Sequence, residues 1–342
     1  PDTVMIASCR FIDNHVQEYP GAGVTCFESS PIITDGYFYG NSGTMGAAIM
    51  CFNNAHPIIQ RCKLINNSAM DSGGGITCIR SSPLILDSII QGNSANTGGG
   101  LSLDRRCESS VVNCLIAENI SATSGGGIYC GQNSKPIISS CTISGNRADV
   151  DGGAMTLNSA EVAIKNSIIW NDIPDEIYLN GSSEISITYS NVKGGFQGEG
   201  NCNADPLFVT GRGGDYYLSS AEAGQSMDSP CRDRGEGNAS DYCFDGHEGK
   251  QWINLMVTRT DGERDRGTID LGFHYPSSVE CENTGCILSM PRPLFLADDV
   301  CYLDVYICNS TAETYIETPL FVILEIAGSM YFAPGFSNFD YE

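Results

Sequence analysis

The sequence predicts an all-β protein built as a parallel β-helix, in which coils of about 26 residues stack along one axis. Three repeating features predict this fold: a recurring asparagine, a glycine-led strand after most of these asparagines, and apolar residues at alternate positions. The asparagine returns every 25 to 27 residues, at Asn14, Asn41, Asn67, Asn93, Asn119, Asn146 and Asn171. A fixed period in this range indicates stacked units, because each unit buries its apolar face only against its neighbours.

The strands that follow the asparagines begin with glycine. They start at Gly46, Gly73, Gly98, Gly125 and Gly152. Within such a strand an apolar residue and a cysteine or leucine stand two positions apart, as Ile76 and Cys78 do. Side chains two positions apart lie on the same face of a strand, so both are expected inside the solenoid.

A second strand precedes each asparagine and carries two more columns. The apolar column contains Phe11, Phe38, Leu64, Ile90, Ile116, Ile143 and Ile168. The column of mostly small residues two positions earlier contains Cys9, Gly36, Cys62, Ser88, Cys114, Cys141 and Asn166. Short strands with period-two alternation and no helical spacing predict three strands per coil, joined by tight turns into a triangular tube.

The asparagines and glycines have structural interpretations. Asparagine tolerates the left-handed backbone conformation, and its amide can bond to the asparagine of the next coil. The glycines that follow relax the backbone where the chain turns. We therefore expect the repeated residues to be scaffold, and any functional site to lie among residues that break the repeat.

Composition excludes several classes of partner. The chain has 342 residues, with 18 Lys and Arg against 41 Asp and Glu, a net charge of −23. Nucleic acid and anionic membrane surfaces are poor partners for such a chain. No apolar run reaches 18 residues, so no membrane insertion is expected. We expect a monomer and a fragment of a longer protein.

Half of the 16 cysteines are in register with the repeat. They are Cys9, Cys26, Cys51, Cys62, Cys78, Cys114, Cys130 and Cys141. Parallel side-chain directions in a stack suit bridging poorly, so these are expected to be free thiols. The pairs Cys281/Cys286 and Cys301/Cys308 are better disulfide candidates and indicate an oxidising compartment.

The coils GGGITCIRSSPLILDSIIQGNSANT and GGGIYCGQNSKPIISSCTISGNRADVD, followed by NCNADPLFV and GTIDLGFHYP, carry a resemblance to a known class. The chain resembles bacterial secreted right-handed parallel β-helix repeat proteins of the pectin-lyase-like superfamily. The resemblance implies a right-handed helix with its closing section over residues 1–276. Residues 277–342 would be the start of a small β-sandwich-like module, cut off before completion.

The superfamily includes polysaccharide lyases and glycosidases, but fold alone does not establish activity. The Asp-Asp and Gly-His-Gly pieces of its pectin hydrolases are absent from residues 1–276. The remaining acidic candidates, Asp71, Asp149 and Asp151, are expected to be turn residues. We therefore expect a secreted or cell-surface, non-catalytic protein that acts as a rigid scaffold or adhesin-like glycan binder. The alternative is a polysaccharide lyase or glycoside hydrolase acting on an acidic polysaccharide.

Candidate ligand-binding residues break the repeat after the glycine-led strand. Phe27, Phe52 and Tyr129 should point outward, where aromatic rings stack on sugars. Arg80, Asp104 and Arg105 follow the strand on successive coils, where they could bind a polysaccharide or cell-surface glycan. Calcium is a further possible ligand, since aspartates on glycine-containing loops offer oxygen ligands. The candidates for it are Asp205, Asp215, Asp233 and Asp245.

Overall fold

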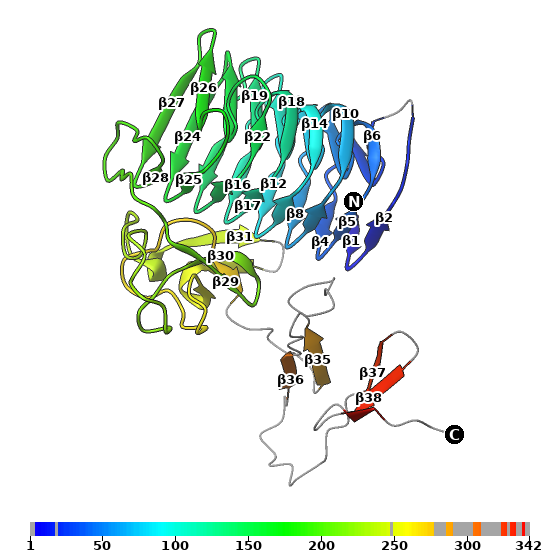
Figure 1. The fold of residues 1–342 in the computed structure, drawn as a ribbon. Coiled ribbons are helices and arrows are strands. Elements are labelled where there is room, and N and C mark those ends of the chain that lie inside the picture. Colours follow the sequence, from blue (N-terminus) through cyan, green and yellow to red (C-terminus); the bar gives the residue numbers. More distant parts are fainter. Residues whose placement is uncertain are drawn as a thin grey trace. The chain divides into compact units, whose positions relative to one another are not determined.

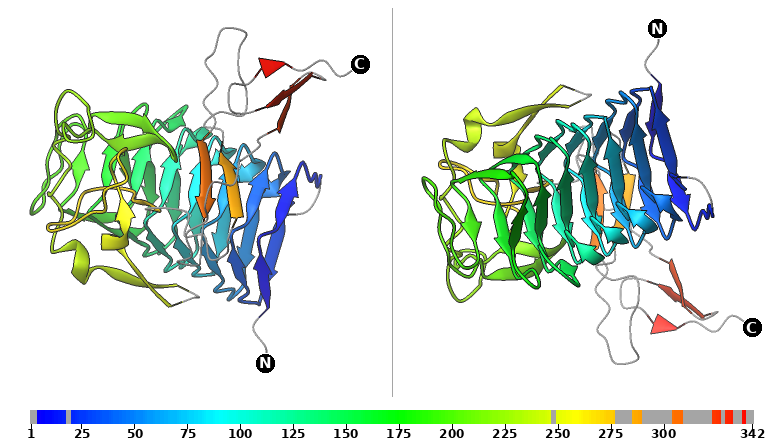
Figure 2. Two further views of the ribbon diagram at one scale, coloured as in Figure 1. Left: turned by 90° about the horizontal axis from the view of Figure 1, so that it is seen from below. Right: turned by 90° about the horizontal axis from the view of Figure 1, so that it is seen from above.

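The computed structural model describes residues 4–17, 20–246 and 249–276, and the backbone of five short strands between residues 285 and 338. The chain divides into two compact units, Pro1–Ser278 and Val279–Glu342. The first unit is a right-handed parallel β-solenoid of about seven turns, with about 26 residues per turn and almost no helix. Figures 1 and 2 show the coils stacked in chain order from blue to green. The predicted fold class is confirmed.

Four parallel sheets form the walls of the solenoid, and the chain visits them in the order A, B, C, D. Sheet A contains β1 Met5–Ala7, β4 Ile32–Thr34, β8 Ile58–Gln60, β12 Leu84–Leu86, β16 Ser110–Val112, β20 Ile137–Ser139, β24 Glu161–Lys165 and β27 Glu184–Thr188. Sheet B contains β2 Arg10–Ile12, β5 Tyr37–Tyr39, β9 Lys63–Ile65, β13 Ile89–Gln91, β17 Leu115–Ala117, β21 Thr142–Ser144, β25 Ile168–Trp170 and β28 Asn191–Val192. Sheet C contains β6 Ser42–Met45, β10 Ser68–Ser72, β14 Ser94–Thr97, β18 Ile120–Ser124 and β22 Arg147–Ala148. Sheet D contains β3 Val24–Phe27, β7 Ile49–Phe52, β11 Ile76–Ile79, β15 Leu101–Asp104, β19 Ile128–Gly131, β23 Met155–Asn158 and β26 Ile177–Asn180.

A typical coil therefore has four strands, and the prediction of three was wrong. The residue between sheets A and B has a positive φ, for example 47° at Asp87 and 48° at Asn113. One left-handed residue turns the chain sharply, so strands that read as one continuous segment in the sequence belong to two sheets.

The asparagines form a continuous ladder at the corner between sheets B and C. The side-chain oxygen of Asn93 accepts bonds from the backbone N–H of Asn67 and from its amide, both at 2.9 Å. The Asn93 amide donates in turn to Leu64 O at 2.9 Å and to Asn119 Oδ1 at 3.0 Å. Asn93 is fully buried, so the ladder satisfies polar groups that water cannot reach.

The last position of the ladder is an aspartate, and the assignment of Asn171 to it was wrong by one residue. Asn146 donates from its backbone N–H and from its amide to Asp172 Oδ1, at 2.6 and 2.8 Å. Asp172 is 5% exposed. Its burial, together with the nearby Glu176 carboxyl, raises the pKa of Asp172.

The interior is filled by the predicted columns. Phe38, Leu64, Ile90 and Ile116 are fully buried, and Cys26, Cys51 and Cys78 align across neighbouring strands. The predicted thiols are free, as are all twelve cysteines among the described residues. Ile168 is an exception, because Ile169 pairs with Ile143 in the interior and Ile168 faces outward.

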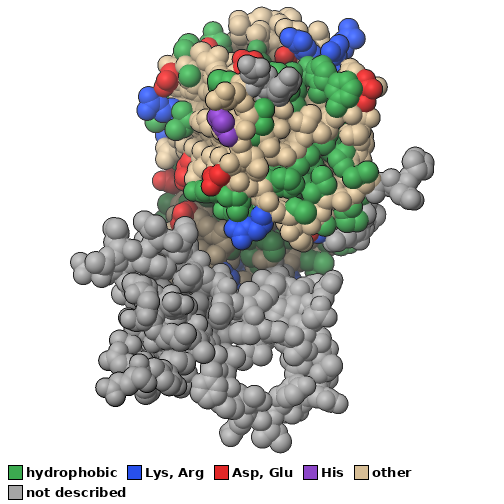
Figure 3. Space-filling model, turned by 90° about the vertical axis from the view of Figure 1, so that its right-hand side faces the viewer, with side chains coloured by type: hydrophobic (Ala, Val, Ile, Leu, Met, Phe, Trp, Pro, Cys, Tyr) green, Lys and Arg blue, Asp and Glu red, His purple; other side chains and the backbone are tan. Residues whose placement is uncertain are grey.

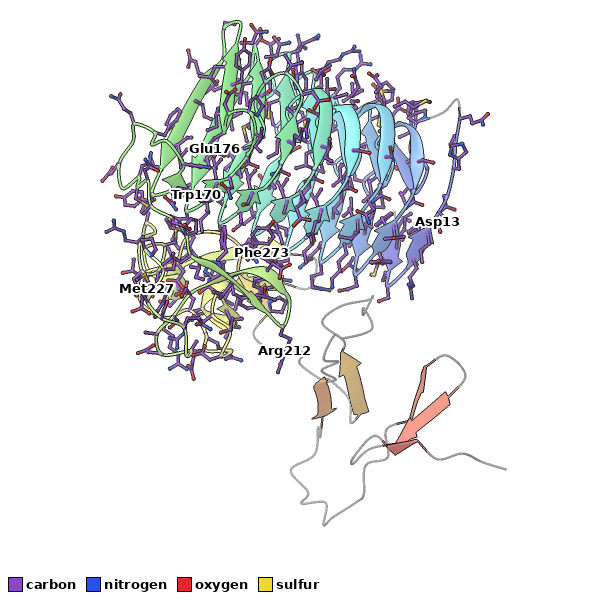
Figure 4. All side chains as sticks on the ribbon, in the orientation of Figure 1. Asp13, Trp170, Glu176, Arg212, Met227 and Phe273 are labelled. Carbon is purple, nitrogen blue, oxygen red and sulfur yellow. The ribbon has the colours of Figure 1, made fainter. Side chains whose placement is uncertain are left out.

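Residues 205–276, here called the C-terminal section, fold back along the outer face of sheet B (Figure 1). The section contains β29 Phe208–Gly211, β30 Gly214–Leu218, β31 Cys243–Gly246, β32 Gly249–Trp252, β33 Met256–Val257 and β34 Tyr275–Pro276, with short 3₁₀ helices η1 Ala239–Asp241 and η2 Ile253–Leu255. In Figure 4, Phe273 lies where the section meets the solenoid, and Met227 lies on the section's outer side. Leu115 and Ala117 of sheet B pack against Tyr217, Phe273 and Tyr275.

The second unit is described only as strand backbone. β35 Gly285–Ser289 pairs antiparallel with β36 Asp304–Cys308, and β38 Ser329–Phe332 pairs antiparallel with β37 Ile323–Ile326 and β39 Ser337–Asn338. The predicted disulfide pairs Cys281/Cys286 and Cys301/Cys308 lie outside the described side chains. Among the described residues, no helix has the length and apolar character to cross a membrane.

Candidate functional site

The six predicted glycan-binding residues lie in or directly after the sheet D strands of five successive coils, β3, β7, β11, β15 and β19. Phe27 is in register with Phe52, Phe52 with Ile79, and Ile79 with Asp104. Gly131 and Asn158 occupy the same strand position on later coils. This column, together with Arg80, Arg105, Arg106 and Tyr129, is here called the sheet D strip.

The first coils supply an aromatic platform. Phe27 is 55% exposed, and its ring centroid lies 5.7 Å from that of Phe52, with the planes tilted by 32°. The Arg80 guanidinium lies 5.4 Å from the centre of the Phe52 ring. Cation–π contact of this kind orients the arginine without neutralising it. In Figure 3, the face on the side of the first coils carries many hydrophobic side chains.

The middle coils supply a fixed carboxylate. Asp104 Oδ1 accepts the backbone N–H of Arg105 at 2.8 Å, and the Arg105 guanidinium lies 3.5 Å from Oδ2. Any Cβ at position 131 would clash with the Asp104 carboxylate, so Gly131 makes room for it. Burial raises the pKa of Asp104, and the Arg105 N–H and guanidinium partly offset this.

Tyr129 is the last predicted member of the strip. Its ring is half-buried, and its hydroxyl accepts a bond from Asn158 Nδ2 at 3.1 Å. This bond leaves the hydroxyl proton of Tyr129 free to donate to a ligand. The aromatic and polar groups of the strip are therefore held in place before any ligand arrives.

The arginines project from the corner after sheet D because the backbone there is left-handed. The φ angles are 50° at Arg80, 58° at Arg105 and 65° at Arg106. Coil-to-coil bonds hold this corner: Asn54 N donates to Arg80 O at 2.8 Å and Arg106 N to Gln132 O at 3.0 Å. Among the described residues, no carboxylate lies within 4.0 Å of the Arg80 or Arg106 guanidinium.

The structure does not gather the predicted calcium ligands. Asp205 Oδ1 caps its own turn by accepting the N–H of Leu207 at 2.9 Å, and Asp233 donates its N–H to Asp270. Asp215 is exposed on β30, and the Asp245 side chain lies outside the described part of the chain. Within the described residues, no group of three or more His, Cys, Asp or Glu side chains could hold a metal ion.

The acidic turn residues have local partners. Asp149 pairs with Arg147 at 3.1 Å, and Asp151 Oδ1 accepts the Thr156 hydroxyl at 3.0 Å. A shallow groove of about 350 Å³ lies elsewhere, on the outer face of sheet A, beside Ile137 and the Lys135–Glu161 ion pair. It contains none of the predicted site residues.

Sequence reasoning missed the polar residues that hold the C-terminal section. Asn113, at the corner between sheets A and B, exchanges two bonds with the His274 backbone, at 2.7 and 2.9 Å. The buried His274 ring places Nε2 2.9 Å from Asp265 Oδ2 and Nδ1 2.9 Å from Gly272 O. The signal available in the sequence was the polar residue that recurs at this corner, as at Asp87, Asn113 and Asn166.

Asp87 shows how the C-terminal section changes the surroundings of a residue on the solenoid. Its carboxylate accepts the Asn113 amide at 2.8 Å. Burial raises the pKa of Asp87 to about 7, although Asn113 and Arg61 lower it in part. Asp87 is therefore a half-buried residue whose protonation depends on the C-terminal section.

Comparison with known proteins agrees with the architecture. Residues 94–204 match the model of a family described as the right handed beta helix region. No curated protein and no solved structure matched the chain.

Proposed function

We propose that this protein is a non-catalytic β-helix that binds a glycan through the sheet D strip. The observation that carries the proposal is the exposed Phe27 ring against the half-buried Phe52 ring, with the fixed polar groups of Asp104 and Tyr129 on later coils of the same sheet. Sugars present apolar ring faces that stack on aromatic side chains and hydroxyls that bond to carboxylates, hydroxyls and guanidinium groups.

The solenoid suits this role because it is a rigid support. Each strip residue is set in register by parallel strand pairing, and the buried asparagine ladder holds neighbouring coils together. A binding group held in place before contact loses less entropy on binding. The same rigidity supports a role as a scaffold or adhesin-like stalk.

The alternative, a lyase or hydrolase acting on an acidic polysaccharide, has less support. Glycoside hydrolysis generally uses two carboxyl groups flanking the bond that breaks. Glu28 follows Phe27, and Asp104 ends β15 three coils later, so these two carboxyl groups lie roughly 14 Å apart along the axis, too far to flank one bond. An isolated carboxyl group can hydrogen-bond a sugar but lacks the second carboxyl group that cleavage needs.

We place the protein outside the cell or at the cell surface, as a monomer related to bacterial secreted pectin-lyase-like proteins. The support for this is the motif resemblance, and two of the buried thiols are compatible with it. Burial raises the pKa of Cys62 to about 12 and also raises the pKa of Cys114. Buried thiols with raised pKa values react slowly with oxidants, so they are compatible with an oxidising compartment.

A glycan microarray tests the proposal. We expect binding by the wild-type protein and at least tenfold weaker binding after Phe27→Ala or Phe52→Ala. Tyr39→Ala, which removes an exposed aromatic from sheet B, is the matched control and should leave binding unchanged. Equal binding by all of these variants would refute the assignment of the strip.

Activity assays separate the two functions. The bound polysaccharides are incubated with the protein, and both reducing ends and unsaturated products are measured. We expect neither to appear. Turnover that disappears in Asp104→Asn would replace the binding proposal with the enzymatic one.

A further inference from the structure

The last strand of sheet D, β26, has a free edge at the end of the solenoid away from the N-terminus (Figure 1). On one side it pairs with β23, where Met155 N donates to Glu176 O at 3.0 Å and Ser159 N to Asn180 O at 3.1 Å. Within the described residues, no strand pairs with its other side. Backbone groups alternate between the two sides of a strand, so the N–H and C=O groups of Leu179 point away from β23. Such unpaired groups can bond to an added strand.

The apolar interior of the solenoid reaches the surface at this edge. Leu179 is in register with Leu157, and Leu157 with Cys130, and both of these earlier residues are fully buried. Leu179 itself is 44% exposed, because no further coil of the described chain lies over it. Ile177, two positions earlier on the same face, is half-buried and packs against the interior cluster. The edge therefore offers apolar surface together with backbone donors and acceptors.

A loop closes the neighbouring part of this end. Phe196 packs against the interior cluster. The backbone N–H of Tyr189 donates to Glu199 O at 2.7 Å, and Asn201 Nδ2 donates to Ile187 O at 2.8 Å. These contacts cover the end of sheet A, whereas three of the four residues of β26 remain exposed. The end of the solenoid is thus closed at sheet A and open at sheet D, which leaves an edge that an extended segment can reach.

Charge decides which occupant the edge favours. Residues 171–192, the last coil, contain four acidic residues and no Lys or Arg, and residues 1–40, in the first coils, contain five acidic residues and one Arg. A second copy of this chain would therefore bring like charge to the edge whichever end of its solenoid it presented, and facing like charges disfavour association. A segment that carries Lys or Arg has the complementary charge.

We infer that β26 is a docking site for an extended, cationic segment of a partner protein, which adds a strand to sheet D. The backbone of the segment bonds to the outward groups of Leu179, and its apolar side chains cover Leu179 and Ile177. Alternate side chains of a strand point to opposite faces, so its Lys or Arg residues lie on the outer face, where the exposed Asp175 and Glu184 attract them. This docking does not depend on glycan binding.

Labelled short peptides test the inference by fluorescence anisotropy at physiological ionic strength. One peptide alternates valine with lysine, a second alternates valine with glutamate, and a third alternates proline with lysine. The third keeps the charge of the first but lacks the N–H groups that strand pairing needs. We expect the valine–lysine peptide to bind at least tenfold tighter than either of the others. Equal binding of the two lysine peptides would show charge attraction alone and overturn the inference.

Leu179→Pro tests the edge itself. Proline removes the outward N–H and leaves the bonds between β26 and β23 in place, so binding of the valine–lysine peptide should weaken at least tenfold. Leu179→Ala keeps the N–H and removes only apolar surface, so it should weaken binding less. Urea denaturation shows whether both variants fold. A folded Leu179→Pro protein that binds the peptide as tightly as the wild type would rule out strand addition at β26.

A charge variant keeps the inference testable if Leu179→Pro does not fold. Asp175→Asn/Glu184→Gln should lose most of the preference for the valine–lysine over the valine–glutamate peptide. Asp71→Asn/Glu108→Gln, which removes two exposed acids from earlier coils, is the matched control and should keep it. Equal effects of the two variants would contradict docking at this end. In sedimentation velocity, a wild-type dimer that disappears in Leu179→Pro would assign the edge to a second copy and overturn the inference.

Discussion

The outer face of sheet B and the sheet D strip belong to the same coils but have opposite surroundings. Along sheet B, outward residues such as Leu115 and Ile168 are buried beneath the C-terminal section. Along the strip, Phe27 remains exposed and Phe52 half-exposed. The difference shows that a repeated scaffold can bury one outer face beneath a later part of the chain and leave another exposed.

The two faces also differ in their charges. On the covered face burial raises the pKa of Asp87 to about 7 and that of Asp270 to about 6. In the strip the raised pKa of Asp104 is countered by its contact with Arg105. Proton uptake on folding is therefore linked to docking of the C-terminal section, and Asp172 of the ladder contributes to it as well.

The largest effect is expected in the interior that both faces share. Ile90→Asp places an unpaired charge in a fully buried position and should destabilise the protein by more than about 4 kcal/mol, enough to prevent folding. Soluble expression and urea denaturation measure it. Ile137→Asp is the control, because Ile137 is 56% exposed on sheet A and its replacement should cost less than about 1 kcal/mol. Similar losses in the two variants would contradict the strand register.

A matched pair of phenylalanines tests the two faces directly. Phe273→Ala removes a buried ring between the C-terminal section and sheet B and should cost about 3 to 4 kcal/mol. Phe52→Ala in the strip should cost less than about 1 kcal/mol. Hydrogen exchange of residues 205–246 and 249–276 should accelerate only in Phe273→Ala. Unchanged exchange in that variant would show that packing of the C-terminal section on sheet B contributes little to stability.

Asn93→Ala probes the ladder beneath both faces. It removes bonds to Asn67, Leu64 and Asn119 and leaves buried polar atoms unpaired, so a loss of about 3 kcal/mol is expected. Asn96→Ala, at an exposed position of sheet C, is the control and should stay within about 0.5 kcal/mol. Thermal and urea denaturation measure the free energy of unfolding of both variants. If Asn93→Ala lowers it no more than Asn96→Ala does, the asparagine ladder does not stabilise the protein.

The smallest effect expected is a pH dependence of the covered face. Because burial raises the pKa values of Asp87 and Asp270, the folded state holds protons that the unfolded state has released. Stability should therefore fall as the pH rises from about 4 through about 7. The pKa of His274 is also raised in the folded state, so protonated His274 stabilises the fold. This contribution to stability is lost as the pH rises through the raised pKa, which is the same direction as for the two aspartates.

We expect about 2 kcal/mol less stability near pH 8 than near pH 5, measured by urea denaturation. Asp87→Asn keeps an oxygen that can accept from Asn113 but cannot titrate, and it should flatten the dependence. Stability that rises between pH 5 and pH 8 would contradict the burial of Asp87 and Asp270 beneath the C-terminal section.

Local pattern predicted the scaffold well. The period, the interior columns and the free thiols follow from residues that repeat at a fixed spacing, and spacing alone sets their face and register. The same spacing places five of the six predicted strip residues at or directly after the ends of the sheet D strands, whereas Tyr129 lies within β19. Pattern failed where the spacing changed: the last coil shifts by one residue, so Asp172 and Ile169 replace Asn171 and Ile168.

The sequence by itself determined the stacked coils, their period and the residues that share a column, because these depend on neighbours one coil away. Only the tertiary structure decided which outer face is covered. His274 meets Asn113 across 161 residues of chain, and no local spacing encodes such a contact. That contact and its neighbours leave Asp87 half-buried with a raised pKa, whereas Phe27 and Arg80 of the sheet D strip are exposed.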